Sequence, residues 1–328
     1  MKKVSLELGS GGRLMRDFIA RRILPSFGNP ILDELTDAGL LSGGLAFTTD
    51  SYVVDPLFFP GGDIGMLAVN GTVNDLVVSG AAPRYHSLAL ILEEGLAEDV
   101  LDKVLASVAR AARKAGVRIV TGDTKVVRQG QGDKVYINTA GLGTSVGRPA
   151  PARIRPGDKV ILTGTLGDHS LAVLAARGDF GLRTRARSDC APLLFLLPLW
   201  RRGALWMRDV TRGGLATVLA ELAERLPWPV VIEEKLVPLS RAVRGAGEIL
   251  GIDPLYMACE GKAVVIAPRR RAGEFLARIR KHPLGRRAAV IGEVQDKVGK
   301  PGELLLRTVS GGLRLLEPLT SELLPRIC

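Results

Sequence analysis

The stretch "RYHSLALILEEGLAEDVLDKVLASVARAARKAGVRIVTGDT" (84–124) decides the fold class. Its first part, 84–94, is rich in apolar residues and predicts a buried strand. Residues 97–116 predict an amphipathic helix, because acidic residues come first, basic residues come last and Gly116 closes the run. Residues 117–124 predict a second short strand. A strand, a helix and a further strand in succession are typical of an α/β protein.

The same alternation continues on both sides of this stretch. In the first half we predict a strand over 45–54, a helix over 63–81 and a strand over 134–146. In the second half the predicted strands are 159–163, 230–233, 263–267 and 288–293, and the predicted helices begin near 168 and span 213–225, 239–250 and 270–281.

A chain of 328 residues exceeds the usual size of a single core and therefore predicts two domains. The stretch 147–160 holds three prolines and two glycines, so we interpret it as the interdomain link. The domains expected are 1–150 and 151–316. Residues 317–328, "EPLTSELLPRIC", show no periodicity and form a predicted tail.

Composition excludes several classes of protein. Apolar residues make up 46% of the chain and charged residues 24%, as in a globular protein. The net charge is +11, but no aromatic residues interleave with the basic ones, so we expect no nucleic-acid partner and instead a surface that meets acidic partners or phosphates. The most apolar window, 190–200, is short and holds two prolines, which argues against a membrane span.

The three cysteines form no CxxC pair, and no apolar segment of a signal peptide follows the first lysines. Both features favour a reducing cytoplasm over a disulfide framework or a structural zinc site. The last cysteine, Cys328, closes the chain. Its thiol is either buried against the protein surface or carries a chemical group between a site on this protein and a partner. The twelve residues from Glu317 onward, if extended, would reach roughly 40 Å.

Three aspartates fall at or beside the ends of predicted elements, namely Asp50, Asp75 and Asp123. Carboxylates that converge with phosphate oxygens make a site suited to Mg²⁺. The alternative is that each aspartate caps a helix or a turn.

Glycine-rich turns at 8–13, 163–169 and 208–215 provide backbone N–H groups that suit phosphate, although glycines there also permit tight turns. No Walker A motif is present, so any nucleotide site has another architecture. Lys125 would provide a positive charge near bound phosphate, and Glu260 would provide a carboxylate that transfers protons. Each is otherwise an ordinary salt-bridging residue.

The motifs "GSGG", "TTDSYVVDPLFFPGGDIG", "GTVNDLVVSGA", "IVTGDTKVV", "GTLGDH", "RDVTRGGL", "CEGK" and the closing "PRIC" occur in order along the chain. Together they resemble the HypE family of hydrogenase maturation carbamoyl dehydratases. This family belongs to the superfamily of aminoimidazole ribonucleotide synthetase, selenophosphate synthetase and thiamine-monophosphate kinase. The resemblance implies a two-domain PurM-like α/β (α+β) architecture. Its N-terminal domain would bind ATP and form a homodimer through its sheet, and its C-terminal domain would close over the site.

The resemblance also implies a reaction on the chain's own tail. A partner carbamoyltransferase would place a carbamoyl group on Cys328, and ATP would drive its dehydration to S-cyanocysteine. The cyanide would then pass to iron on a scaffold complex, as a ligand of the [NiFe]-hydrogenase site. An amide oxygen is a poor leaving group, so its conversion to a phosphate ester makes its loss feasible.

Specific roles follow from the resemblance. Mg²⁺ would be held by Asp50, Asp75 and Asp123, Glu260 would be the base, and Lys125 would stabilise the phosphorylated oxygen. The further residues expected at the nucleotide are Asn74, Gly122, Asp168, His169, Arg212, Gly213 and Gly214. The chain departs from the family in having Leu8 in place of a histidine before "GSGG" and Cys259 in place of an asparagine before "EGK".

Two other functions remain open at this point. One is a small-molecule kinase or synthetase of the same superfamily, which would need no cysteine tail. The other is a non-catalytic basic binding module. Consumption of ATP that depends on carbamoylated Cys328 would separate the first interpretation from both.

Overall fold

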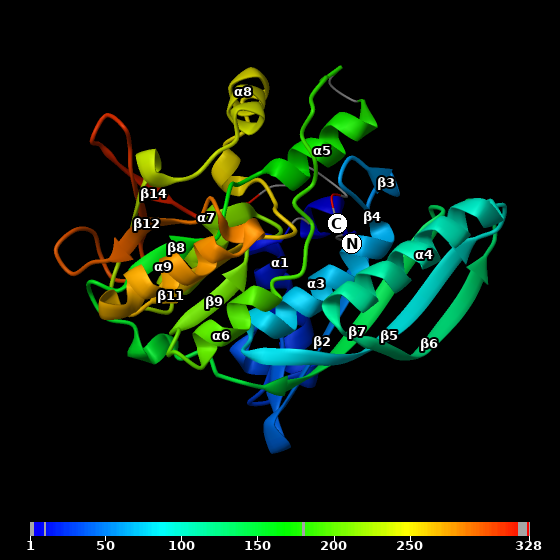
Figure 1. Ribbon diagram of the computed structural model, residues 1–328, viewed down its shortest axis with the longest axis horizontal. Helices are drawn as coiled ribbons and strands as arrows, with labels where there is room; N and C mark the ends of the chain where they lie inside the picture. Colours follow the sequence, from blue (N-terminus) through cyan, green and yellow to red (C-terminus); the bar gives the residue numbers. More distant parts are fainter. Residues whose placement is uncertain (1–2, 10, 179–180, 321–326, 328) are drawn as a thin grey trace.

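The structure is a computed structural model that describes residues 3–9, 11–178, 181–320 and 327. It contains two larger β-sheets, one built from residues between 39 and 145 and the other from residues between 159 and 316, with helices packed on them (Figure 1). This confirms the expected α/β class.

In the described residues the first sheet has five strands in the order β1-β2-β7-β5-β6. Strands β5 and β6 are parallel because α4 carries the chain back between them, whereas β7 runs antiparallel to both β2 and β5. The elements are α1 (Gly12–Phe18), α2 (Leu24–Phe27), β1 (Gly39–Leu41), β2 (Leu45–Tyr52), β3 (Phe58–Phe59), β4 (Gly62–Asp63), α3 (Ile64–Val78), β5 (Ala81–Glu93), α4 (Glu98–Ala115), β6 (Arg118–Val127) and β7 (Val135–Ser145).

Among the residues that the structure describes, helices cover only one face of this sheet. In Figure 1 α3 and α4 lie on the same side of it, and β7 accordingly alternates between buried and half-buried residues. The opposite face lies open, and nearly every residue of the edge strand β6 is exposed.

Helix α3 joins the two halves of the molecule. It is buried almost throughout, because it packs on the first sheet on one side and on the second half of the chain on the other. Trp200 donates from its indole Nε1 to the carbonyl oxygen of Val77 at 2.8 Å, and Val73 packs in one apolar cluster with Leu193 and Leu199. A helix that is apolar on all sides is expected in such a position.

The second sheet, again in the described residues, has seven strands in the order β14-β13-β10-β12-β8-β11-β9. Its elements are β8 (Lys159–Leu162), α5 (Asp168–Arg177), α6 (Leu197–Trp200), β9 (Trp206–Asp209), α7 (Gly214–Ala223), β10 (Val230–Glu233), α8 (Arg241–Leu250), β11 (Ala263–Ala267), α9 (Ala272–Lys281), β12 (Ala289–Val294), β13 (Leu304–Arg307) and β14 (Leu313–Leu316).

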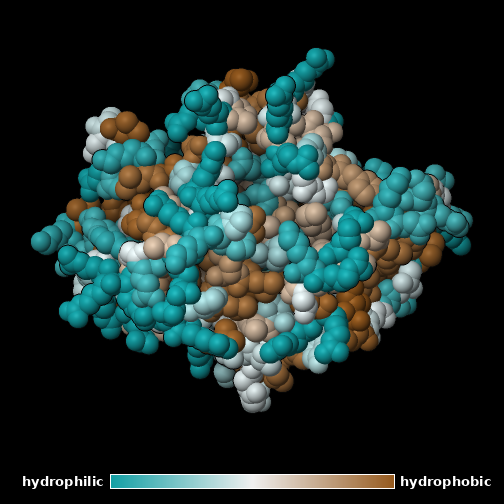
Figure 2. Space-filling model, in the orientation of Figure 1, coloured by the Kyte–Doolittle hydropathy of each residue, from teal (hydrophilic) through white to brown (hydrophobic). Residues whose placement is uncertain are grey.

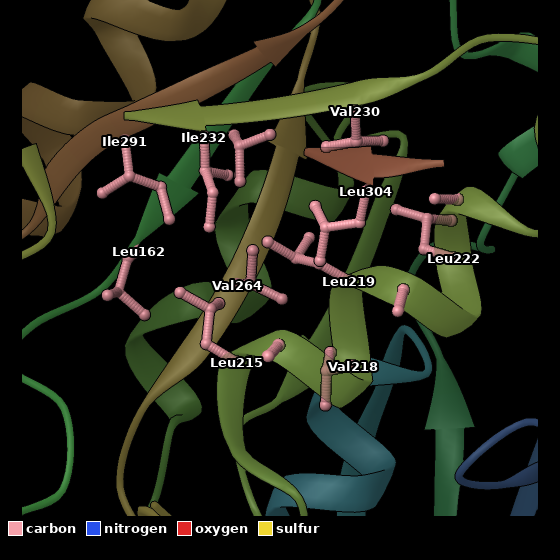
Figure 3. Packing of buried hydrophobic residues seen from close by; sticks show 14 of the residues in the cluster. Leu162, Leu215, Val218, Leu219, Leu222, Val230, Ile232, Val264, Ile291 and Leu304 are labelled. Atoms are coloured by element: carbon pink, nitrogen blue, oxygen red, sulfur yellow. The ribbon is translucent and has the colours of Figure 1, made fainter. Parts of the chain in front are cut away.

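Helix α7 supplies much of the core on one face of this sheet. Leu215, Leu219 and Leu222 recur at helical spacing and point at the strand residues Val230 and Leu304, among others (Figure 3). This packing fixes the N-terminus of α7, and with it the turn that precedes the helix, relative to the sheet.

Most predicted elements are confirmed, and two strands, 230–233 and 263–267, have the bounds expected. The predicted helix over 239–250 begins at Arg241 instead, because the Oγ of Ser240 caps it by accepting a hydrogen bond from the backbone N–H of Val243. The short strands β9, β13 and β14 were not predicted, since four-residue strands give too little periodicity to identify.

Among the described residues, none of the helices is both long and apolar enough to cross a membrane.

Candidate active site

A cluster of aspartates lies where the two halves meet. Asp50 comes from β2, Asp75 from α3 and Asp209 from the end of β9, and Asp37 lies nearby, before β1. The hydroxyl of Thr48 donates to Asp75 Oδ2 at 3.0 Å. The structure therefore brings Asp50 and Asp75 together, as predicted, and adds Asp209.

Burial and mutual repulsion raise the pKa values of these carboxylates. Burial raises the pKa of Asp75 well above its ordinary value, and the other three aspartates raise it further. Burial and the neighbouring carboxylate of Asp37 raise the pKa of Asp209 to about 8, against the opposing effect of Arg208. Burial also raises the pKa of Asp50, which Arg212 opposes. Crowded, desolvated carboxylates of this kind are relieved when a cation binds.

The donor set of this cluster fits Mg²⁺. Its carboxylate oxygens are the hard ligands that this ion prefers, and Mg²⁺ commonly uses one or two carboxylates together with substrate phosphates and water. Within the described ranges, no three His, Cys, Asp or Glu side chains are already grouped around a common point that would hold a metal. The cluster thus fits an ion that arrives with a nucleotide rather than a closed all-protein site.

The structure does not bring Asp123 to this cluster within one copy of the chain. Asp123 lies on β6, which is separated from β2 by β7 and β5, and three strand spacings amount to roughly 14 Å. Its carboxylate pairs instead with Lys125 Nζ at 2.7 Å, and both side chains are more than half exposed. This hydrogen bond and the charge of Lys125 lower the pKa of Asp123.

Lys125 and Gly122 share this position on the exposed strand β6 and are likewise remote from Asp50. A Cβ atom at Gly122 would lie 2.2 Å from the carbonyl oxygen of Leu88 on the neighbouring strand. The glycine is therefore required by the close approach of β5 and β6, and its predicted contact with nucleotide is not supported within one copy.

The turn of the "RDVTRGG" motif lies beside the aspartates. Gly213 and Gly214 both have positive φ, and a Cβ atom at Gly214 would clash with the backbone around Tyr256, so only glycine fits the start of α7. Arg212 donates to the carbonyl oxygen of Gly9 at 3.3 Å, which links this turn to the glycine-rich N-terminal segment.

A cavity of about 300 Å³ lies between that segment and the turn, and it is lined by Gly11, Gly12, Thr36, Thr211 and Arg212 among others. Its cationic groups and its position beside the aspartates suit a polyphosphate.

Glu260 lies in a second part of the site, where its side chain is buried. Its side chain is 3% exposed, and Oε1 has no hydrogen-bond partner in the described part of the chain. Burial raises the pKa of Glu260 well above its ordinary value, the carboxylates of Asp209 and Asp189 raise it further, and Arg212 opposes them. A desolvated carboxylate with a raised pKa and an open oxygen has the properties of a proton acceptor that is more basic than an exposed glutamate.

Two neighbours fix the backbone around Glu260. The backbone N–H of Glu260 donates to Asp189 Oδ1 at 3.0 Å, and Asp189 forms a buried ion pair with Lys262 at 3.1 Å. Cys259, which replaces the expected asparagine, is buried, and its Sγ accepts a hydrogen bond from the backbone N–H of Gly167 at 3.2 Å. Cys259 therefore supports the start of α5.

Asn74 and Asp168 have structural partners where nucleotide contacts were expected. The amide of Asn74 donates to the carbonyl oxygens of Ala191 and Glu260 and accepts from the backbone N–H of Leu193, so it ties α3 to the second half. The carboxylate of Asp168 accepts hydrogen bonds from Thr165 and Ser240. Their polar side-chain atoms are used within the protein.

His169 contacts the tail of the chain. Its Nε2 lies 2.6 Å from the carbonyl oxygen of Ile327, and its Nδ1 lies 2.8 Å from Ser188 Oγ. Ile327 is 8% exposed and packs in the apolar cluster that includes Cys190 and Ala258. The penultimate residue therefore lies inside the molecule. The predicted carrier Cys328 and the tail residues 321–326 lie outside the described residues.

The residue that sequence reasoning missed is Asp209. The motif "RDVTRGG" was identified, but only its arginine and glycines were selected from it. The unrecognised strand β9 places Asp209 at its end, beside Asp50 and Asp75. Recognition of this strand would have pointed to an aspartate at its carboxyl end.

Comparison with known proteins shows where this arrangement occurs elsewhere. Residues 35–145 match the profile of the AIR synthase related protein, N-terminal domain, and residues 155–301 match its C-terminal domain. The carbamoyl dehydratase HypE of Rhodobacter capsulatus is 48% identical over 337 aligned positions, which cover 100% of this chain and 98% of that protein.

Two solved structures are also similar over most of this chain. A structure of the hydrogenase maturation protein HypE in complex with ATP has a TM-score of 0.83 and 47% identity, and covers 99% of this chain and 100% of that one. A chain of a HypE–HypF complex has a TM-score of 0.87 and 40% identity, and covers 92% of this chain and 99% of that one.

Proposed function

The chain belongs to the HypE carbamoyl dehydratase family of AIR synthase related proteins, and from that premise we propose that it uses ATP to dehydrate the S-carbamoyl group on its own Cys328. The product is S-cyanocysteine, whose cyanide serves the [NiFe]-hydrogenase site. The observation that carries this proposal is the buried carboxylate of Glu260, with an open Oε1, two residues after Ala258, which packs in one cluster with Ile327.

The reaction balances as a dehydration coupled to hydrolysis of ATP. The carbamoyl oxygen attacks the γ-phosphorus, the bond to ADP breaks, and one N–H proton is lost. The second N–H proton is then removed as the C–O bond breaks, phosphate leaves and the C≡N bond forms. Glu260 accepts a proton in this sequence, and its raised pKa matches that task.

The remainder of the site positions the nucleotide. Arg212 and the backbone of the turn at Gly213 and Gly214 hold phosphate oxygens at the N-terminus of α7. A similar HypE structure is a complex with ATP, which supports binding of this nucleotide by the family. When bound, Mg²⁺ would neutralise phosphate charge, and the residues that would hold it are Asp50, Asp75 and Asp209.

Partners follow from the same chemistry. A HypF-type carbamoyltransferase would load Cys328, in keeping with the HypE–HypF complex, and an iron-holding scaffold would accept the cyanide. A carrier that depends on a free thiol fits the reducing cytoplasm. We place the boundary between the nucleotide-binding and the C-terminal domain in the connection between β7 and β8.

Mass spectrometry of the C-terminal peptide tests the function. After incubation with the carbamoyltransferase, carbamoyl phosphate and ATP, Cys328 gains one carbamoyl group and then loses one water. Without ATP the carbamoyl adduct accumulates, and the Cys328→Ser variant stays unmodified. A peptide that remains unmodified at Cys328 refutes the function, and ATP turnover that persists in Cys328→Ser favours a small-molecule kinase or synthetase.

The open face of the first sheet supports a homodimer. Large apolar side chains are exposed on this face, including Phe47 of β2 at 46% and Tyr85 and Ile91 of β5 at 40% and 43% of their area. Figure 2 shows apolar side chains along the lower right edge, over the strands that Figure 1 labels β5 to β7. A second copy on this face would bury β6, which is the route by which Asp123 and Lys125 would approach a nucleotide in the partner copy.

Sedimentation analysis checks this dimer. The double variant Phe47→Asp/Ile91→Asp should be monomeric at concentrations at which the wild type is dimeric, because each charge would be desolvated in the interface. Ile249→Asp on α8, where the side chain is 78% exposed, is the matched control and should remain a dimer. A wild-type chain that sediments as a monomer at tens of micromolar overturns the proposal.

A further inference from the structure

The described part of the C-terminal segment is bound to the protein through its backbone. The Tyr256 hydroxyl donates to the carbonyl oxygen of Glu317 at 3.0 Å. The backbone N–H of Leu319 donates to Thr217 Oγ1 at 3.0 Å, and its carbonyl oxygen accepts from the backbone N–H of Arg13 at 2.9 Å. These contacts are made to backbone atoms, while Pro318 between them is buried.

The contacts at Ile327 differ in kind. Its side chain packs in an apolar cluster with Phe59 and Cys190. Its carbonyl oxygen is hydrogen-bonded to the imidazole Nε2 of His169. Phe59 also meets the His169 ring edge to face, with ring centroids 5.4 Å apart. The site therefore recognises both the main chain and the apolar side chain of the penultimate residue.

The hydrogen-bond partners of His169 determine its tautomer. A carbonyl oxygen only accepts, so Nε2 carries the proton that is donated to Ile327. Ser188 Oγ accepts from the backbone N–H of Cys190 at 3.1 Å and donates its own proton to His169 Nδ1. Burial lowers the pKa of His169, which keeps the ring neutral and consistent with this chain of hydrogen bonds.

These contacts leave the His169 ring unable to offer a nitrogen to nucleotide. The ring is fully buried, and protein atoms occupy both nitrogens. His169 lies at the start of α5. The Sγ of Cys259 stabilises this helix start by accepting a hydrogen bond from the backbone N–H of Gly167. The second half of the protein thus presents one imidazole N–H at a fixed place for a main-chain carbonyl group.

We propose that His169, Ser188 and Phe59 form a binding subsite for the penultimate residue of the chain's own C-terminus, and that His169 is a positioning residue that seats the tail for dehydration. This proposal rests on the proposed function, because it names the recognition of that function's substrate. The ligand of this subsite is Ile327, through its main-chain carbonyl group and its β-branched apolar side chain.

The test uses the full chain with His169→Phe, which keeps a ring of similar size without its nitrogens, and His169→Gln, which retains an N–H donor at a similar reach. Ile327→Ala removes the apolar half of the recognition and leaves His169 intact. Three quantities are measured for each variant. They are the rate of alkylation of Cys328 by iodoacetamide in the absence of nucleotide, the single-turnover rate of dehydration, and the dissociation constant for ATP.

Loss of one neutral hydrogen bond should shift the seating equilibrium by about tenfold. We expect alkylation of Cys328 to rise by up to about tenfold in His169→Phe and dehydration to fall by about the same factor, with the dissociation constant for ATP unchanged. His169→Gln should recover most of both rates, and Ile327→Ala should behave like His169→Phe. Cys259 is buried and packs in a different cluster from Ile327, so it serves as an internal control that stays unlabelled.

Two results would overturn the subsite. One is alkylation and dehydration that stay at the wild-type rates in both His169→Phe and Ile327→Ala. The other is an ATP affinity about tenfold weaker in His169→Phe with unchanged alkylation, which would return His169 to the nucleotide. The alkylation measurement needs no reaction to occur. A wild-type protein that fails to dehydrate its carbamoyl group therefore refutes the function, while the subsite is still judged separately.

Discussion

Replacing Glu260 by Gln lowers the rate of dehydration of carbamoylated Cys328 by about 10²–10⁴-fold, the range expected when a general base is lost. The side chain keeps its size and remains buried, but an amide does not accept the nitrogen proton as the C≡N bond forms. Because the proposed role of Glu260 is proton transfer and not a contact with phosphate, the affinity for ATP should change by less than about threefold. Single-turnover mass spectrometry with saturating ATP measures the step directly.

The dependence on pH gives a second signature of Glu260. The base must be deprotonated, and burial places its pKa well above the ordinary value of 4.5. The wild-type rate should therefore rise with pH along a limb that lies above pH 4.5, and this limb should vanish in Glu260→Gln.

Glu274→Gln on the surface of α9 is the matched control, because it removes a carboxylate that pairs with Arg202 and Arg271 outside the site. Its dehydration rate should equal that of the wild type. A Glu260→Gln variant with the wild-type rate would exclude Glu260 as the base.

Replacing Asp209 by Asn separates stability from activity. We expect dehydration to fall by roughly 10²–10³-fold, because a carboxylate that would hold the metal is lost. In the absence of nucleotide and metal the same variant should melt at a temperature higher by about 3–6 °C at pH 7.5. Dehydration assays and thermal unfolding with and without Mg²⁺ and ATP measure both effects.

The sign of the stability effect follows from the pKa of Asp209. Its pKa is raised in the folded protein to about 8, from an ordinary value of 3.8. Between these two values the native state binds more protons than the unfolded state, so the free energy of unfolding decreases as pH rises. The asparagine does not titrate, and the gain in melting temperature should disappear near pH 4.

Asp99→Asn is the control for this experiment, because it removes an exposed carboxylate paired with Lys103 at 2.8 Å on α4 and should change neither quantity noticeably. An Asp209→Asn variant that keeps full activity, or one that melts lower at pH 7.5 without metal, would contradict the role of Asp209 in the aspartate cluster.

The fold was largely predictable from the sequence because its elements are long and regular. The helix α4 carries its acids, bases and closing glycine in the order that a helix requires, and α3 is mostly apolar because both of its sides are covered, with Asn74 and Asp75 among its few polar residues. Most of the elements that the sequence did not reveal are four residues long or shorter, where neither a helical nor a strand period can be recognised, and the seven-residue helix α1 was also missed.

The environment of some predicted site residues follows from local sequence. Glu260 is buried with an open carboxylate oxygen, and the glycines of "RDVTRGG" begin a helix, while their roles stay predictions. The sequence did not reveal which atoms would face other side chains. Asn74 and Asp168 are polar residues in suitable motifs, yet their side-chain atoms bind neighbouring parts of the protein.

The sequence alone determined the two α/β halves, the family and the cysteine at the end of the chain, because these follow from local pattern and from motifs read in order. The tertiary structure decided which aspartates meet. Asp123 and Asp50 are separated by the strand order of the first sheet, whereas Asp209, far along the chain, reaches Asp50 because α3 packs on both halves. It also decided that His169 holds Ile327. Convergence of side chains depends on how strands and helices pack, and that information is not present in any single stretch of sequence.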